Sequence, residues 1–147
     1  MELDPKLAIA WNLMSLSLSN LGNYEEALAC SEQAINLYPE YAEAWNNKAF
    51  AFGNMGRHDK ALEASKRAIE LEPNLALAWS NISAALNSMG NYEEALEASE
   101  KAIEIDPKLK LAWNCKCLAL LKLNRPKELF EVIRIIKNLE SNESIDQ

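Results

Sequence analysis

The sequence predicts an all-α protein built from four similar helical hairpins, eight helices in total. Glycine and proline are scarce, with four and five copies among 147 residues, which is too few for the many turns of an all-β protein. Ala, Leu, Glu and Lys are abundant, and these residues favour helices. Three residue types recur with a step of 34 residues: Trp11, Trp45, Trp79 and Trp113; Pro5, Pro39, Pro73 and Pro107; and Gly22, Gly56 and Gly90. A fixed period of this length indicates stacked repeats of one supersecondary unit.

The first helix of each unit is predicted over residues 8–21, 42–55, 76–89 and 110–123. Each segment places apolar residues at helical spacing and is followed by the recurring glycine in the first three units. Glycine readily adopts the left-handed conformation that ends a helix, and Asn124, which holds this place in the fourth unit, is the next best residue for it.

The second helix of each unit is predicted to begin just after this joint and to end before the recurring proline. Asn23 and Asn91 are expected to be N-caps, with Glu26 and Glu94 completing a capping box three residues later. Because one hairpin cannot bury its apolar face alone, the units are expected to stack into a single domain over residues 1–147. The expected units are residues 8–41, 42–75, 76–109 and, in degenerate form, 110–143.

The second helix of the last unit departs from the pattern. Pro126 suits its first turn, where a missing N–H group costs nothing. Leu129 and Ile136 replace two alanines of the earlier units, and Ile135 replaces a polar residue. Since a terminal repeat normally has a polar outer face, this helix is expected to meet a partner, a second copy or missing sequence. A self-contained capping helix is the alternative. The proposed self-association residues are Phe130, Ile135 and Leu139, and the polar residues 140–147 are expected to fray.

Over residues 8–143 the chain resembles the tetratricopeptide repeat family. Counted from Ala8, Ala42, Ala76 and Lys110, Trp falls at position 4, Gly at 15, Tyr or His at 17, Ala at 20 and 27, and Pro at 32. Two family features are missing, the Leu-Gly pair at positions 7 and 8 and the aromatic residue at position 24. The resemblance implies a right-handed α-solenoid whose concave face is lined by the first helix of each unit.

No arrangement of residues in this sequence suggests catalysis, a metal or a cofactor. The single histidine, His58, stands at the position of Tyr24 and Tyr92, so we interpret it as a packing residue. There is no second histidine for a metal pair, no nucleophile–histidine spacing and no glycine-rich phosphate loop. We therefore predict a protein that is not an enzyme and that needs no cofactor.

The net charge of −7 argues against general affinity for nucleic acid or for an anionic membrane. No signal peptide and no run of membrane-spanning length is visible. Three cysteines, an odd number, are expected to be reduced and to pack as small apolar residues: Cys30, Cys115 and Cys117. Together these features predict a cytoplasmic protein.

The family resemblance places positions 2, 5, 6 and 9 of each first helix in the groove, where this sequence has a row of asparagines flanked by apolar residues. An asparagine side chain offers a donor and an acceptor, which suits both polar groups of an extended peptide backbone. Each such bond contributes only about 1 kcal/mol, so apolar contacts must supply most of the affinity. The predicted groove residues are Asn12, Leu16, Asn46, Asn47, Phe50, Leu77, Asn81, Asn114 and Leu118.

The sequence thus predicts a protein-binding scaffold or adaptor that holds an extended, largely uncharged peptide. Asparagines that are merely polar surface residues are the simpler alternative for this row. Two other functions stay open, self-assembly through the terminal repeats and docking of a basic partner on an acidic convex face.

One branch of the family binds the acidic C-terminal tails of chaperones through a clamp of Lys, Arg and Asn. In this chain the five clamp positions hold no cation in either possible register, so such a tail is not expected to be the ligand. The two registers read Asn12, Leu16, Asn47, Leu77 and Asn81, or Asn46, Phe50, Asn81, Leu111 and Cys115.

Overall fold

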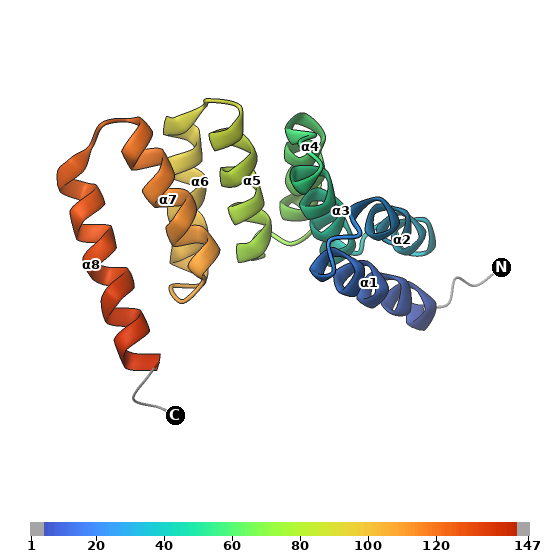
Figure 1. The fold of residues 1–147 in the computed structure, drawn as a ribbon. Coiled ribbons are helices and arrows are strands. Elements are labelled where there is room, and N and C mark those ends of the chain that lie inside the picture. Colours follow the sequence, from blue (N-terminus) through green and yellow to red (C-terminus); the bar gives the residue numbers. More distant parts are fainter. Residues whose placement is uncertain (1–4, 144–147) are drawn as a thin grey trace.

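The computed structural model describes residues 5–143, and the side chains of residues 5–141, as eight α-helices without a β-strand in this range (Figure 1). This confirms the predicted α-solenoid of four helical hairpins. The helices are α1 Pro5–Asn20, α2 Tyr24–Leu37, α3 Ala42–Asn54, α4 His58–Leu71, α5 Ala76–Ser88, α6 Tyr92–Ile105, α7 Lys110–Lys122 and α8 Pro126–Glu143.

The joint inside each hairpin is a left-handed helix end, as predicted. The φ angles are 82° at Gly22, 73° at Gly56, 85° at Gly90 and 54° at Asn124. In each joint the next N–H group reaches back to the last turn of the first helix, as in the 2.9 Å bond from Asn23 N to the Leu18 carbonyl. This bond pattern satisfies a carbonyl that the helix end leaves without a partner.

The predicted capping boxes are not formed. Asn23 and Asn91 do stand at the N-cap positions of α2 and α6, but their side chains make no capping hydrogen bond. At Asn23, φ is −85° and ψ is 66°, outside the extended region that N-cap residues usually adopt. The tight glycine joint fixes this backbone geometry, and it turns the side chain away from the N–H groups of the helix.

The tryptophans and prolines share a period because they form one hydrogen bond. The indole Nε1 of Trp45 donates to the Pro39 carbonyl at 2.9 Å. Trp79 and Trp113 donate in the same way, at 2.8 Å, to the carbonyl of the proline six residues earlier. Each bond fixes the link between two units to the first helix that follows, and it satisfies a donor that must find a partner when half-buried.

Serines occupy the two positions where the family pattern is missing. At position 8, Ser15 and Ser83 donate to the carbonyls of Ala27 and Ala95 at 2.8 and 2.6 Å, which ties the two helices of a unit together. At position 24, Ser31 and Ser99 are fully buried and donate to carbonyls three residues earlier in their own helices. These four hydroxyls are paired, whereas Ser65, at position 24 of the second unit, is fully buried and its hydroxyl has no partner among the described residues.

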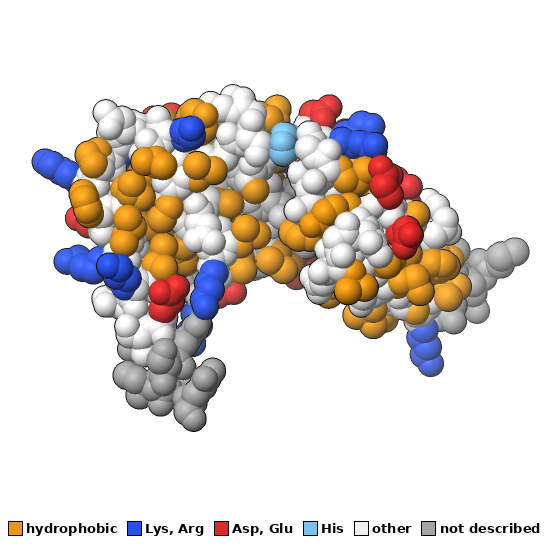
Figure 2. All heavy atoms as spheres, in the orientation of Figure 1, with side chains coloured by type: hydrophobic (Ala, Val, Ile, Leu, Met, Phe, Trp, Pro, Cys, Tyr) orange, Lys and Arg blue, Asp and Glu red, His pale blue; other side chains and the backbone are white. Residues whose placement is uncertain are grey.

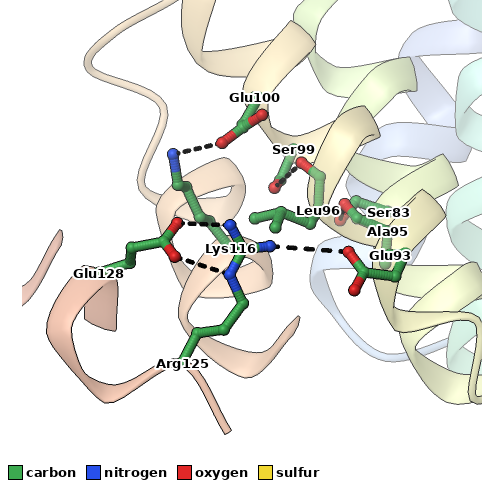
Figure 3. Close-up of polar contacts among 9 residues, drawn as sticks. All are labelled: Ser83, Glu93, Ala95, Leu96, Ser99, Glu100, Lys116, Arg125 and Glu128. Carbon is green, nitrogen blue, oxygen red and sulfur yellow. Dashed lines mark hydrogen bonds and ion pairs between the residues drawn. The ribbon is translucent and has the colours of Figure 1, made fainter. Parts of the chain in front are cut away.

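Ion pairs repeat with a step of two units. Lys116 pairs with Glu100 at 2.8 Å, and Arg125 pairs with Glu128 and reaches Glu93 at 3.6 Å (Figure 3). In the first two units the equivalent pairs are Lys48–Glu32 at 3.0 Å and Arg57–Glu25 at 3.7 Å. In each copy of the recurring segment, at 22–28 and at 90–96, a glutamate thus pairs with the arginine at the next joint.

The contacts between helices define the two faces of the solenoid. The first helices α1, α3, α5 and α7 contact one another in order, whereas the backbones of the described second helices stay apart. The first helices therefore lie on the inner, concave side of the curve and the second helices on the outer, convex side (Figure 1).

The last helix packs more loosely than the other second helices. It contacts α7 much less extensively than α2, α4 and α6 contact their own first helices. The larger Leu129 and Ile136, which replace alanines, pack against the core cluster that includes Trp113 and Leu120. The expectation of a frayed tail is wrong for residues 140–143, which continue α8, and the Ser141 hydroxyl donates to the Lys137 carbonyl. Residues 144–147 lie outside the described range.

Every helix between residues 5 and 143 is too short or too polar to cross a lipid bilayer.

Candidate functional site

The concave face carries a line of solvent-exposed apolar side chains. Four of the predicted groove residues are between 36 and 45% exposed, a large fraction for apolar side chains on packed helices: Leu16, Phe50, Leu77 and Leu118. Ile9 and Leu13 add to this surface on α1. Figure 2 shows hydrophobic side chains gathered over α1 and over the region of α5 and α7. A surface of this kind marks an interaction site more often than it marks ordinary protein surface.

The asparagine row is a hydrogen-bonded ladder between neighbouring first helices. The Asn47 amide donates to Asn12 Oδ1 at 2.8 Å, and the Asn81 amide donates to Asn46 Oδ1 at 2.9 Å. All four side chains are buried, and the Asn12 amide in turn donates to the Tyr41 hydroxyl at 3.1 Å. Each rung joins position 5 of one unit to position 6 of the next unit.

The ladder explains why asparagine, a poor helix former, stands at these positions. The structure brings four predicted site residues together, but with part of their hydrogen-bonding capacity already used between units. Asn114 differs because no described unit follows it, and its side chain is exposed at the end of the row.

The third junction replaces the rung by a serine and a cysteine. The Cys115 thiol lies 3.8 Å from the Ser80 carbonyl, and the buried Ser80 hydroxyl has no partner among the described residues. Burial raises the pKa of the Cys115 thiol to about 11, so it stays protonated and unreactive at neutral pH. Cys30 is also buried and Cys117 half-buried, as predicted, and burial raises the pKa of both thiols.

A cavity of about 220 Å³ opens in the groove between α3, α5 and α7. Phe50, His58, Asn81, Ala84 and Leu111 contribute to its walls. The Phe50 ring is held in an edge-to-face contact with Tyr24, with ring centroids 6.5 Å apart. The cavity is smaller than the usual site for a drug-sized ligand, so it suits one side chain of a longer ligand.

His58 lines the cavity in the groove, which its position in the sequence did not predict. Sequence comparison placed it correctly in the joint between α3 and α4, where the other units have tyrosine. Its contact with the cavity depends on how α4 is packed beside α3, which the position in the repeat does not reveal. Among the described residues, no three His, Cys, Asp or Glu side chains are grouped to hold a metal ion.

The two ends of the array expose apolar side chains where the inner units have covered or polar residues. On α1, Leu13 and Met14 are exposed, whereas the equivalent residues of α5, Asn81 and Ile82, are buried. On α8, Phe130 and Ile135 are exposed, and Phe130 is the most open of them at 73%. Leu139, the third predicted self-association residue, is instead half-buried against the core around Trp113.

Comparison with known proteins supports a shared architecture. The model of the tetratricopeptide repeat family matches residues 6–71 and 40–108. No curated protein sequence matches this chain.

Several solved structures have a similar fold. MamA from Desulfovibrio magneticus RS-1 is 21% identical, with a TM-score of 0.79 over 96% of this chain and 78% of that chain. The Sgt2 domain from Aspergillus fumigatus is 24% identical, with a TM-score of 0.75 over 82% of each chain. The first such domain of Spaghetti (RPAP3), bound to the HSP90 peptide SRMEEVD, is 20% identical, with a TM-score of 0.72 over 93% of this chain and 98% of that chain. At these identities the likeness shows the fold.

Proposed function

This chain belongs to the tetratricopeptide repeat family, and we propose that its concave groove holds an extended, largely uncharged peptide segment of a partner protein. Domains of this family are protein-interaction modules and are generally not catalytic. The observation that supports the groove as the site is the line of exposed apolar residues along the first helices, with the cavity beside Phe50 in its middle part.

Apolar contacts supply most of the affinity in this proposal. Covering apolar surface stabilises a complex by about 25 cal/mol per Å², and Leu16, Phe50, Leu77 and Leu118 all present such surface. The buried asparagines act mainly by holding the first helices in register, so that the apolar residues form one continuous groove. Asn114 is exposed and is free to bond a peptide backbone.

The acidic tail of a chaperone is not the proposed ligand. The similar RPAP3 domain was solved with such a peptide, SRMEEVD. In this chain the exposed residues at the clamp positions include Leu16, Phe50 and Leu77. An apolar side chain cannot replace the cation that compensates a carboxylate for losing its water.

We expect Leu77→Asp to weaken the binding of a groove peptide about tenfold or more, because it places a charge where apolar surface is covered. A largely uncharged peptide is first selected from a random linear library on the wild-type chain, and affinities are then measured by titration calorimetry. Met89→Asp is the matched control, since Met89 closes the other end of α5 and is exposed to the same degree, 44% against 45%. Equal affinity of Leu77→Asp and wild type would refute the proposal.

Self-assembly through the ends of the array is the second candidate function, favoured by the exposure of Phe130. If it is correct, the wild-type chain has a mass above that of a monomer in light scattering at micromolar concentration, and Phe130→Glu restores the monomer mass because it places a charge in the contact. Ile9→Glu, on the concave side of α1, should leave the mass unchanged. A wild-type chain that is monomeric throughout this concentration range excludes the candidate.

A further inference from the structure

A large cavity lies on the convex side, away from the concave groove. It has a volume of about 640 Å³ and runs between α2 and α4 above α3. Trp45 and Phe52 form its floor, and we call it the Trp45 groove. Phe52 and Phe50 are two residues apart on α3 and so face different sides, which separates this groove from the concave one.

At two positions on the rim of the Trp45 groove, the charge is opposite to that of the first and third units. Lys60 and Lys66 of α4 line it. The equivalent positions of the first and third units hold glutamates instead, Glu26 and Glu32 on α2, and Glu94 and Glu100 on α6. The convex face is therefore not uniformly acidic, because the cations and carboxylates of α4 balance, whereas α2 and α6 are acidic.

Lys60 and Lys66 form no ion pair with any other described residue. By contrast, two other cations of the rim are already paired, Lys48 with Glu32 at 3.0 Å and Arg67 with Glu70 at 2.9 Å. Ammonium groups without an ion pair beside a cavity remain available for a ligand carboxylate.

Cations and aromatic rings meet in this groove. The Lys60 ammonium lies 5.8 Å from the centre of the Phe52 ring, and the Lys48 ammonium lies 5.4 Å from that of Trp45. These distances allow cation–π attraction, which orients the ammonium groups over the floor. A ligand thus meets apolar surface at the bottom of the groove and positive charge at its rim.

The neighbouring convex grooves lack this combination. The groove between α4 and α6 has a volume of about 500 Å³, but Ile82 and Leu86 replace Lys48 and Phe52. Its acidic residues, Glu70, Glu94 and Glu97, outnumber its lysines. In the last unit Trp113 is buried within the core cluster.

We propose that the Trp45 groove binds an acidic segment of a partner protein, in which an apolar side chain lies between carboxylates. The apolar side chain would cover Trp45 and Phe52, and the carboxylates would pair with Lys60 and Lys66. Charge favours a segment with separate carboxylates over a nucleic acid, because Glu32, Glu63 and Glu70 also line the groove and would repel a continuous phosphate backbone.

The test compares selections from a random linear peptide library on the wild-type chain and on the double variant Lys60→Glu, Lys66→Glu. Peptides recovered on the wild type alone should be enriched in Asp and Glu around an apolar residue. A fluorescent peptide of this set should lose about tenfold or more of its affinity for the double variant, and its binding should weaken from low ionic strength to about 0.15 M.

Three matched variants locate the binding. The double variant Lys60→Arg, Lys66→Arg keeps both positive charges and should bind the acidic peptide as tightly as wild type. Lys122→Glu reverses a charge on α7, away from this groove, and should also leave the affinity unchanged. Leu77→Asp should also leave it unchanged, which separates this site from the concave groove. The proposal fails if the wild-type selection shows no acidic enrichment, or if the double variant binds the acidic peptide as tightly as wild type. Circular dichroism of the double variant must first show an unchanged melting curve, as expected for two exposed positions.

Discussion

Replacing Leu120 with alanine should lower the free energy of unfolding by about 2–5 kcal/mol, the range for a leucine truncated inside a packed core. Leu120 is fully buried on α7 and lies in a cluster with Leu96, Trp113 and Val132. It is the largest of the fully buried side chains, so its removal leaves a cavity that the neighbouring helices cannot close without moving.

The adjacent Leu121 provides the control, because it has the same chemistry and the same helix but is 62% exposed. Leu121→Ala should change the free energy of unfolding by no more than about 0.5 kcal/mol. Urea denaturation measures both variants, with attention to whether the slope of the transition stays constant. Similar losses for the two variants would contradict the packing described for α7.

Replacing Asn81 with alanine should lower the free energy of unfolding by about 1–3 kcal/mol, because Asn46 Oδ1 then loses its donor inside the protein. The double variant Asn46→Ala, Asn81→Ala should cost less than the sum of the single variants, since the unpaired group is removed as well. Asn114→Ala is the control, because that side chain is exposed at the end of the row.

Equal losses for Asn81→Ala and Asn114→Ala in the same denaturation experiment would show that the ladder does not stabilise the array. The expected result also affects how binding data are interpreted. A weaker peptide affinity after Asn81→Ala would combine lost contacts with a loosened groove, so substitutions at the exposed apolar residues are the cleaner probes of binding.

The fold was predictable because its signals repeat in register. Trp45 and Pro39 recur with the same step since they share a hydrogen bond, and Gly56 recurs since the joint needs a left-handed residue. The prediction of capping boxes was wrong because it used only the spacing of Asn and Glu. The tight joint before α2 sets the backbone angles of Asn23, and that spacing does not contain this information.

The asparagine row was predictable from the repeat, but the hydrogen bonds within it were not. The rungs of the ladder join residues 35 positions apart, one more than the period, so a comparison of equivalent positions does not pair Asn12 with Asn47. The Trp45 groove is visible in the sequence as a difference between units, because Lys60 and Lys66 stand where the first and third units have glutamate. The sequence alone does not indicate a binding site there, because only the structure shows that Phe52 and the two lysines line the same cavity.

The most direct test of the concave groove is to locate a bound groove peptide by NMR, with labelled leucine methyl groups and labelled tryptophan indoles. Saturation with the peptide selected on the wild-type chain should shift the methyl signals of Leu16, Leu77 and Leu118, which are exposed along the first helices. The indole signal of Trp45, on the convex side, should stay in place. Shifts confined to Trp45, with the three leucines unchanged, would contradict the account.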